Sequence, residues 1–169
     1  MEALMSNYVI SKIDSFSQEK ASTGSVLWVL HADKVPPHIG LSVNGLFYSL
    51  KANGKDTAAP ISSLLEVINR RGITTLCFNL KDDLPLDVIN GVFNDYEKTI
   101  PNQITCLNPI KELLNQNGAS KLIELLASLE ESRRINSVTG LNIPLEFSGI
   151  KDYDVSDIHA RLTLLNKKS

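Results

Sequence analysis

The chain has few cysteines and little aromatic content. Its 169 residues include two cysteines, Cys77 and Cys106, and a single tryptophan, Trp28. Two cysteines are too few for a disulfide framework or a structural zinc site, so we expect no metal and no cofactor. In a reducing compartment both thiols would be free. One tryptophan offers no platform of aromatic rings on which sugars could stack.

The sequence also lacks a basic surplus and long apolar segments. Its formal net charge is -2 and its pI is about 5.9, which argues against a nucleic-acid partner or an anionic membrane surface. No segment approaches the roughly 18 apolar residues of a membrane span. Residues 1–20 lack the basic and apolar regions of a secretory signal. We therefore predict a cytoplasmic protein with no membrane span, and leave its oligomeric state open.

The pattern of β-forming and helical segments predicts an α+β fold, in which helices pack on a small, mainly antiparallel sheet. The Asn44-Gly45 pair between two β-rich runs predicts a hairpin, because both central positions of its turn need positive φ. We treat residues 1–169 as a single domain whose last part, 119–169, is a helical C-terminal extension with at most a short strand in 136–149. The expected strands are 24–31, 38–43, 46–52 and 73–80, and the expected helices include 60–72, 84–99 and 106–118, with a weaker helical pattern over 8–20.

One thiol and one imidazole lie where nucleophilic catalysis would need them. Cys106 is at the predicted start of a helix, with Thr105 as its N-cap, or with Asn108 as the cap if the helix begins at Pro109. Unpaired backbone N–H groups and the helix dipole there favour the thiolate and lower the thiol pKa. His38 begins a predicted strand and could act as general base and then acid. Cys77 lies inside a predicted strand, where we interpret it as a buried apolar residue.

The order of these elements resembles the circularly permuted NlpC/P60 superfamily of papain-like cysteine enzymes. In that group a hydrophobic strand precedes a histidine strand of the type H-[VI]-G-[IL], a turn follows, and the cysteine begins a later helix. Here residues 24–30, His38-Ile39-Gly40-Leu41, Asn44-Gly45 and Thr105-Cys106 follow the same order, over about residues 22–118. The resemblance implies a papain-like fold and a cysteine hydrolase of the amidase, peptidase, thioesterase or acyltransferase type. Its substrate would be a small molecule, peptide or acyl compound that forms an acyl-cysteine intermediate.

The family usually carries a polar residue on the second hairpin strand that orients the imidazole. Matching the turn places Ser49 in that role, whereas strict strand pairing selects Lys51, and a β-bulge would reconcile the two. We favour Ser49, and expect backbone N–H groups at the helix start, including that of Cys106, to hold the oxyanion. Because serine brings no charge, the alternative is a catalytically silent binding or regulatory module that retains the papain-like fold. A plain interaction domain without this ancestry is a third hypothesis.

Overall fold

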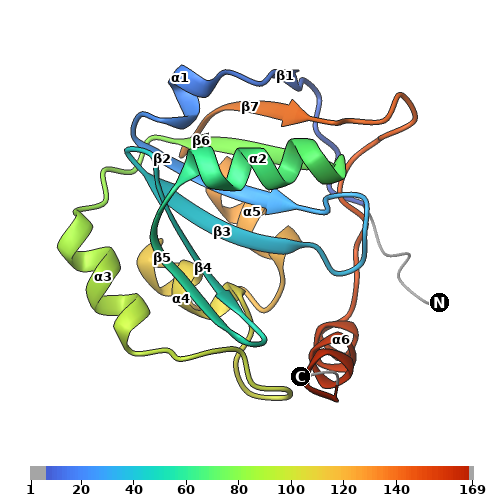
Figure 1. The fold of residues 1–169 in the computed structure, drawn as a ribbon. Helices are drawn as coiled ribbons and strands as arrows, with labels where there is room; N and C mark the ends of the chain where they lie inside the picture. Colours follow the sequence, from blue (N-terminus) through green and yellow to red (C-terminus); the bar gives the residue numbers. More distant parts are fainter. Residues whose placement is uncertain (1–6, 168–169) are drawn as a thin grey trace.

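The computed structural model describes residues 7–167 and centres on one seven-stranded sheet (Figure 1). The strand order is β1-β7-β6-β2-β3-β4-β5. All neighbouring strands are antiparallel except β1 and β7. The α+β class and the mainly antiparallel sheet are thus confirmed. The strands are β1 (Asp14–Ser15), β2 (Ser25–Leu30), β3 (His38–Val43), β4 (Leu46–Lys51), β5 (Gly54–Pro60), β6 (Thr75–Leu80) and β7 (Ile135–Leu141).

The predicted hairpin forms at the predicted place. Asn44 and Gly45 have φ angles of 48° and 83°, and Val43 pairs directly with Leu46 across the turn. A second tight turn follows, because Lys51 pairs with Gly54 and begins the β4–β5 hairpin. The four predicted strands all lie in the same sheet, with β2 between β3 and β6.

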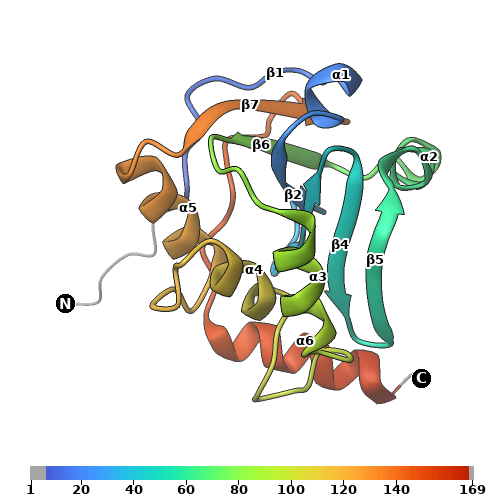
Figure 2. The ribbon, with the colours of Figure 1, turned by 90° about the vertical axis from the view of Figure 1, so that its left-hand side faces the viewer.

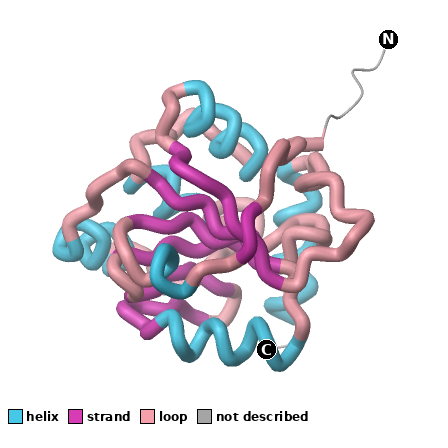
Figure 3. Tube along the Cα trace, turned by 90° about the horizontal axis from the view of Figure 1, so that it is seen from above, coloured by secondary structure: helices cyan, strands magenta, loops and turns pink. Residues whose placement is uncertain are grey.

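Helices cover both faces of the sheet. Helix α2 lies on one face, while α3, α4 and α5 lie on the other, as the side view shows (Figure 2). Helix α6 lies at one end of the sheet, beside the tip of the β4–β5 hairpin (Figures 1 and 2). The view from above shows the sheet enclosed between these helices (Figure 3). The helices are α1 (Gln18–Ala21), α2 (Ile61–Arg71), α3 (Leu86–Asn94), α4 (Leu107–Leu113), α5 (Leu122–Glu131) and α6 (Val155–Lys167).

Each face of the sheet has its own apolar core. The larger core joins the sheet to α3, α4 and α5, and the smaller one lies under α2 around Trp28. The indole Nε1 of Trp28 donates a hydrogen bond of 2.8 Å to Ser42 Oγ, and its ring meets Phe47 edge to face at 6.1 Å. Gly40 leaves room for that phenylalanine, since a Cβ there would lie 2.3 Å from Phe47 Cζ. The glycine of the H-I-G-L motif therefore has a packing role.

One expectation about the sheet was wrong, because the sheet has seven strands and is not small. The C-terminal segment supplies one of them, since the short strand allowed within 136–149 is β7, which pairs with β6 along its length. Its sequence, INSVTGL, mixes a few apolar residues with polar ones and is mostly half-buried, so its strand pattern is weak. Strand β5, GKDTAAP, carries even fewer apolar residues and was missed.

The helical pattern predicted over residues 8–20 was also wrong for most of its length. Only the short α1 is helical there, and β1 precedes it. Ile13 packs against the larger core and Phe16 against the smaller one, while Val9 is 72% exposed. The segment thus contributes side chains to the cores on both faces of the sheet, whereas one face of a helix would pack on a single core.

Helices α3 and α4 end earlier than predicted. Helix α4 ends at Leu113, and Asn115, with φ of 57°, turns the chain before Gly118 is reached. Helix α3 covers only residues 86–94 of the predicted 84–99. Across residues 7–167, none of the helices combines the length and the apolarity that a bilayer crossing needs.

Candidate active site

A cavity of about 830 Å³ lies where β3 and β4 separate. The ladder between the two strands pairs Leu41–Val43 with Leu46–Tyr48 and stops there, so His38 and Ile39 have no partner on β4. Side chains from the β2–β3 loop, α4 and α6 complete the walls. Both Cys106 and His38 line this cavity, so the structure brings the two predicted residues into one site.

Cys106 immediately precedes α4, and side-chain hydrogen bonds of Thr105 and Asn108 stabilise the start of the helix. The Leu107 N–H donates to Thr105 Oγ1 (3.2 Å), and the Thr105 N–H donates to Asn108 Oδ1 (2.7 Å). This reciprocal arrangement is a capping box in which asparagine takes the usual place of glutamate or glutamine. The helix begins at Leu107, so the alternative in which Asn108 caps a helix starting at Pro109 was wrong, and Asn108 accepts the Thr105 N–H from inside the first turn. Cys106 itself packs against the larger core.

The thiol of Cys106 is neutral in this setting. Burial raises its pKa, and the backbone N–H groups of Ile39 and of Cys106 itself, which lie against the sulfur, lower it by less. The direction is opposite to the lowering expected at a helix start, because desolvation of the thiolate outweighs these donors. The same two N–H groups are placed to stabilise a negative charge that develops beside the sulfur.

The imidazole of His38 is also neutral. Its Nε2 is buried and has no hydrogen-bond partner within residues 7–167. Burial lowers the His38 pKa to about 4, with Asp56 raising it and Lys51 and His31 lowering it further. The cross-strand partner of His38 is Leu30, which belongs to the Trp28 core, so alternation along the strand places His38 on the α2 face.

Cys106 and His38 therefore approach the open end of the β3–β4 ladder from opposite faces of the sheet. Cys106 packs with the larger core, and its sulfur meets the strand at the Ile39 backbone, next to His38. In the described part of the chain no hydrogen bond joins the thiol to the imidazole. The resting site is thus an uncharged thiol and an uncharged imidazole that share a cavity.

Ser49 is buried in β4, and its hydroxyl donates to Asp56 Oδ2 at 2.8 Å. Lys51 Nζ contacts the other oxygen of the same carboxylate at 3.1 Å. If the β3–β4 register is continued, Lys51 lies opposite His38. The irregularity in β4 lies in its pairing with β5, at Phe47–Ser49, and not in its pairing with β3. Ser49, Lys51 and Asp56 therefore form one polar group beside His38.

Asp56 is the residue that sequence reasoning missed. It pairs directly with Ser49 on the strand that follows, and its negative charge raises the His38 pKa. A signal was present, since Asn53-Gly54 is a second Asn-Gly pair, which favours another hairpin. A returning strand after that turn would bring Asp56 beside Ser49.

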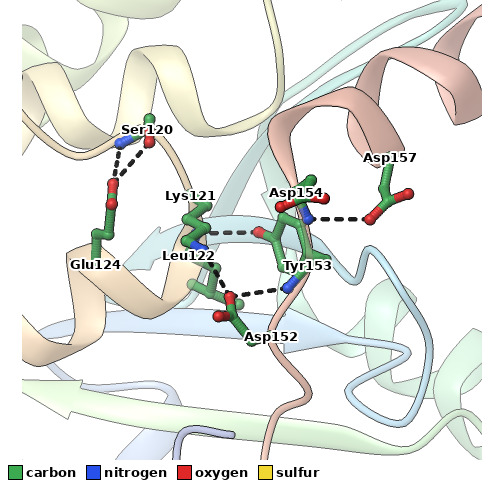
Figure 4. Close-up of polar contacts among 8 residues, drawn as sticks. All are labelled: Ser120, Lys121, Leu122, Glu124, Asp152, Tyr153, Asp154 and Asp157. Carbon is green, nitrogen blue, oxygen red and sulfur yellow. Dashed lines mark hydrogen bonds and ion pairs between the residues drawn. The ribbon is translucent and has the colours of Figure 1, made fainter. Parts of the chain in front are cut away.

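The far wall of the cavity comes from the C-terminal segment. Tyr153 is 4% exposed, and its hydroxyl accepts a hydrogen bond of 3.0 Å from the Leu122 N–H (Figure 4). Beside it, Lys121 Nζ contacts Asp152 Oδ1 at 2.7 Å (Figure 4). These contacts fix the start of α6 to the start of α5. Farther along, the Asn102 N–H donates to His159 Nδ1 at 2.6 Å, so α6 is also tied to the loop before Cys106.

No group of three or more metal-ligating side chains occurs within residues 7–167. Comparisons with models of known protein families, with curated proteins and with solved structures found no match to the chain.

Proposed function

We propose that the protein is a cysteine-dependent hydrolase that acts on amide or ester bonds through an acyl-cysteine intermediate. The observation that supports it is the cavity that holds the Cys106 thiol, the His38 imidazole and two backbone N–H groups together. The resemblance of the strand and helix order to permuted NlpC/P60 enzymes points to the same chemistry. Cys106 is the nucleophile, and His38 is the base and then the acid.

The reaction starts from the neutral pair. As the Cys106 sulfur bonds to the substrate carbonyl carbon, its proton passes to His38, and the N–H groups of Ile39 and Cys106 hold the oxyanion. The bond to the leaving amine or alcohol then breaks, and His38 returns the proton to it. Water next attacks the acyl-cysteine, giving one proton to His38, which the departing sulfur takes back.

Asp56 has a positioning role in this scheme. The imidazolium that forms on His38 is costly in a buried site, and the Asp56 carboxylate favours that charged form. Ser49 and Lys51 hold the carboxylate in place by the two contacts described above. Ser49 thus acts on His38 through Asp56.

A second candidate is a silent binding module that keeps this cavity. Two observations favour it: burial disfavours both the thiolate of Cys106 and the imidazolium of His38, and no hydrogen bond joins the two side chains within residues 7–167. Such a protein would bind a ligand in the cavity without converting it to a product.

Acylation by p-nitrophenyl octanoate separates the two candidates. We expect intact-protein mass spectrometry to show octanoylation of the native chain and of the Cys77→Ala variant, with steady release of p-nitrophenol. Cys106→Ala should stay unmodified, and His38→Gln should react more slowly by about 10²- to 10⁴-fold. Acylation that persists in Cys106→Ala would refute the assignment of the nucleophile. Absence of acylation in the native chain would favour the binding module.

A further inference from the structure

The cavity walls combine apolar side chains with three cationic ones. The apolar part comes from strands, α4, α5 and α6, and includes Leu30, Leu50, Leu107, Leu122, Ile158 and Leu162. Among the described residues that line the cavity there is no aspartate and no glutamate, whereas Lys34, Lys51 and Arg161 are all present. A volume of about 830 Å³ lies within the range that accommodates a small organic ligand.

The three cations differ in how far their charge is already balanced. Lys51 is paired with Asp56 at 3.1 Å, and Lys34 lies 3.9 Å from Asp33. Arg161 is exposed at the edge of the cavity and makes no ion pair within residues 7–167. A guanidinium binds a carboxylate through two parallel N–H donors, which a lysine ammonium does not. Arg161 is therefore the cation best suited to a carboxylate on a ligand.

Helix α6 places this arginine beside the apolar wall. Ile158, Arg161, Leu162 and Leu165 all line the cavity, at the spacing of one helical face. The start of the helix is fixed by the Tyr153 and Asp152 contacts, so the position of this face is set by the fold (Figure 4).

We infer that the cavity selects substrates in which an apolar acyl chain is joined to a group that carries one carboxylate, and that Arg161 binds this carboxylate. N-acyl amino acids have this chemistry. The inference rests on the proposed function, because it names the substrate class of the same site. The apolar chain lies against the leucine and isoleucine side chains, and the carboxylate lies at the exposed edge.

Calorimetric binding to the Cys106→Ala variant tests the inference without turnover. The probes are N-octanoylglycine and N-octanoylglycinamide, which differ only in the negative charge. We expect the acid to bind at least about tenfold more tightly than the amide, equivalent to about 1.4 kcal/mol. Adding Arg161→Gln should reduce this preference to less than about twofold. Adding Arg70→Gln, which removes the same charge from an exposed position on α2, should leave it unchanged. The preference should also weaken as salt is raised.

The inference is overturned if the two probes bind equally, if neither binds, or if the preference survives Arg161→Gln. These outcomes differ from failure of the proposed function. Acylation of Cys106 without a carboxylate preference would leave the hydrolase proposal standing and remove the substrate class. A carboxylate preference without acylation would keep the ligand class and favour the binding module.

Discussion

The buried imidazole of His38 should make folding stability depend on pH. The His38 pKa falls from 6.5 to about 4 on folding, mainly because burial disfavours the charged ring. Between these values the unfolded chain binds a proton that the native protein does not, so stability rises with pH there. The contribution is fully present above pH 6.5, declines as the pH falls, and is lost at about pH 4. Its size is about 3 kcal/mol, at 1.36 kcal/mol for each pKa unit.

Urea unfolding of the native chain and of His38→Gln, followed from pH 7.5 to pH 4, measures this contribution. Glutamine keeps a polar end group but does not titrate, so the difference between the two stability curves isolates His38. We expect the difference to change by about 3 kcal/mol across the range, with the native chain losing more stability on acidification. His31→Asn removes a different histidine, which is exposed and whose positive φ of 54° suits asparagine. This variant should keep most of the pH dependence, because His31 is the smallest of the causes that lower the His38 pKa. Parallel curves for the native chain and His38→Gln would refute the buried, neutral imidazole.

Three further predictions concern the surroundings of the site. Gly40→Ala should lower the free energy of unfolding in urea by about 1–3 kcal/mol, since its Cβ would meet the buried Phe47 ring. Gly91→Ala on α3, where a Cβ meets open space, should not destabilise the protein. Equal effects of the two substitutions would contradict the packing role of Gly40. In NMR titrations Asp56→Asn should lower the His38 pKa and Lys51→Gln should raise it, so shifts of the same sign would refute the polar group beside the ring. Iodoacetamide should label Cys106 before Cys77, whose thiol is fully buried with its pKa raised to about 12, and the reverse order would contradict the assigned burial.

The fold was most predictable where local signals and tertiary packing agree. The Asn44-Gly45 turn fixes the β3–β4 hairpin, since few residue pairs tolerate its two positive φ angles. Gly72, with φ of 62°, likewise ends α2 at the predicted residue. Strands β5 and β7 carry few apolar residues, and their place depends on pairing with neighbours, which a local pattern does not encode. The apolar residues of the 8–20 segment have a helix-like spacing, but they pack on two different cores, which the sequence pattern does not distinguish from one helical face.

The sequence predicted two residues of the candidate site, Cys106 and His38, but not the direction of the change in the Cys106 pKa. Cys106 and His38 were selected by their positions at the start of a helix and a strand, and both line the same cavity. The raised pKa of the thiol follows from its burial against segments distant in sequence, including the β3 backbone at Ile39, which no local pattern around Cys106 reveals. Asp56 was missed because β5 carries too few apolar residues to stand out as a strand, although the Asn53-Gly54 pair before it favours a hairpin.

The pH dependence of Cys106 acylation by p-nitrophenyl octanoate tests the central claim most directly. If neutral His38 removes the proton from the neutral thiol, the rate should be nearly constant between about pH 5 and pH 8, because both groups keep their protonation states there. In His38→Gln only the thiolate reacts, so the rate should rise about tenfold for each pH unit over the same range. A native chain that shows the same tenfold rise would contradict the account, because His38 would then play no part in activating Cys106.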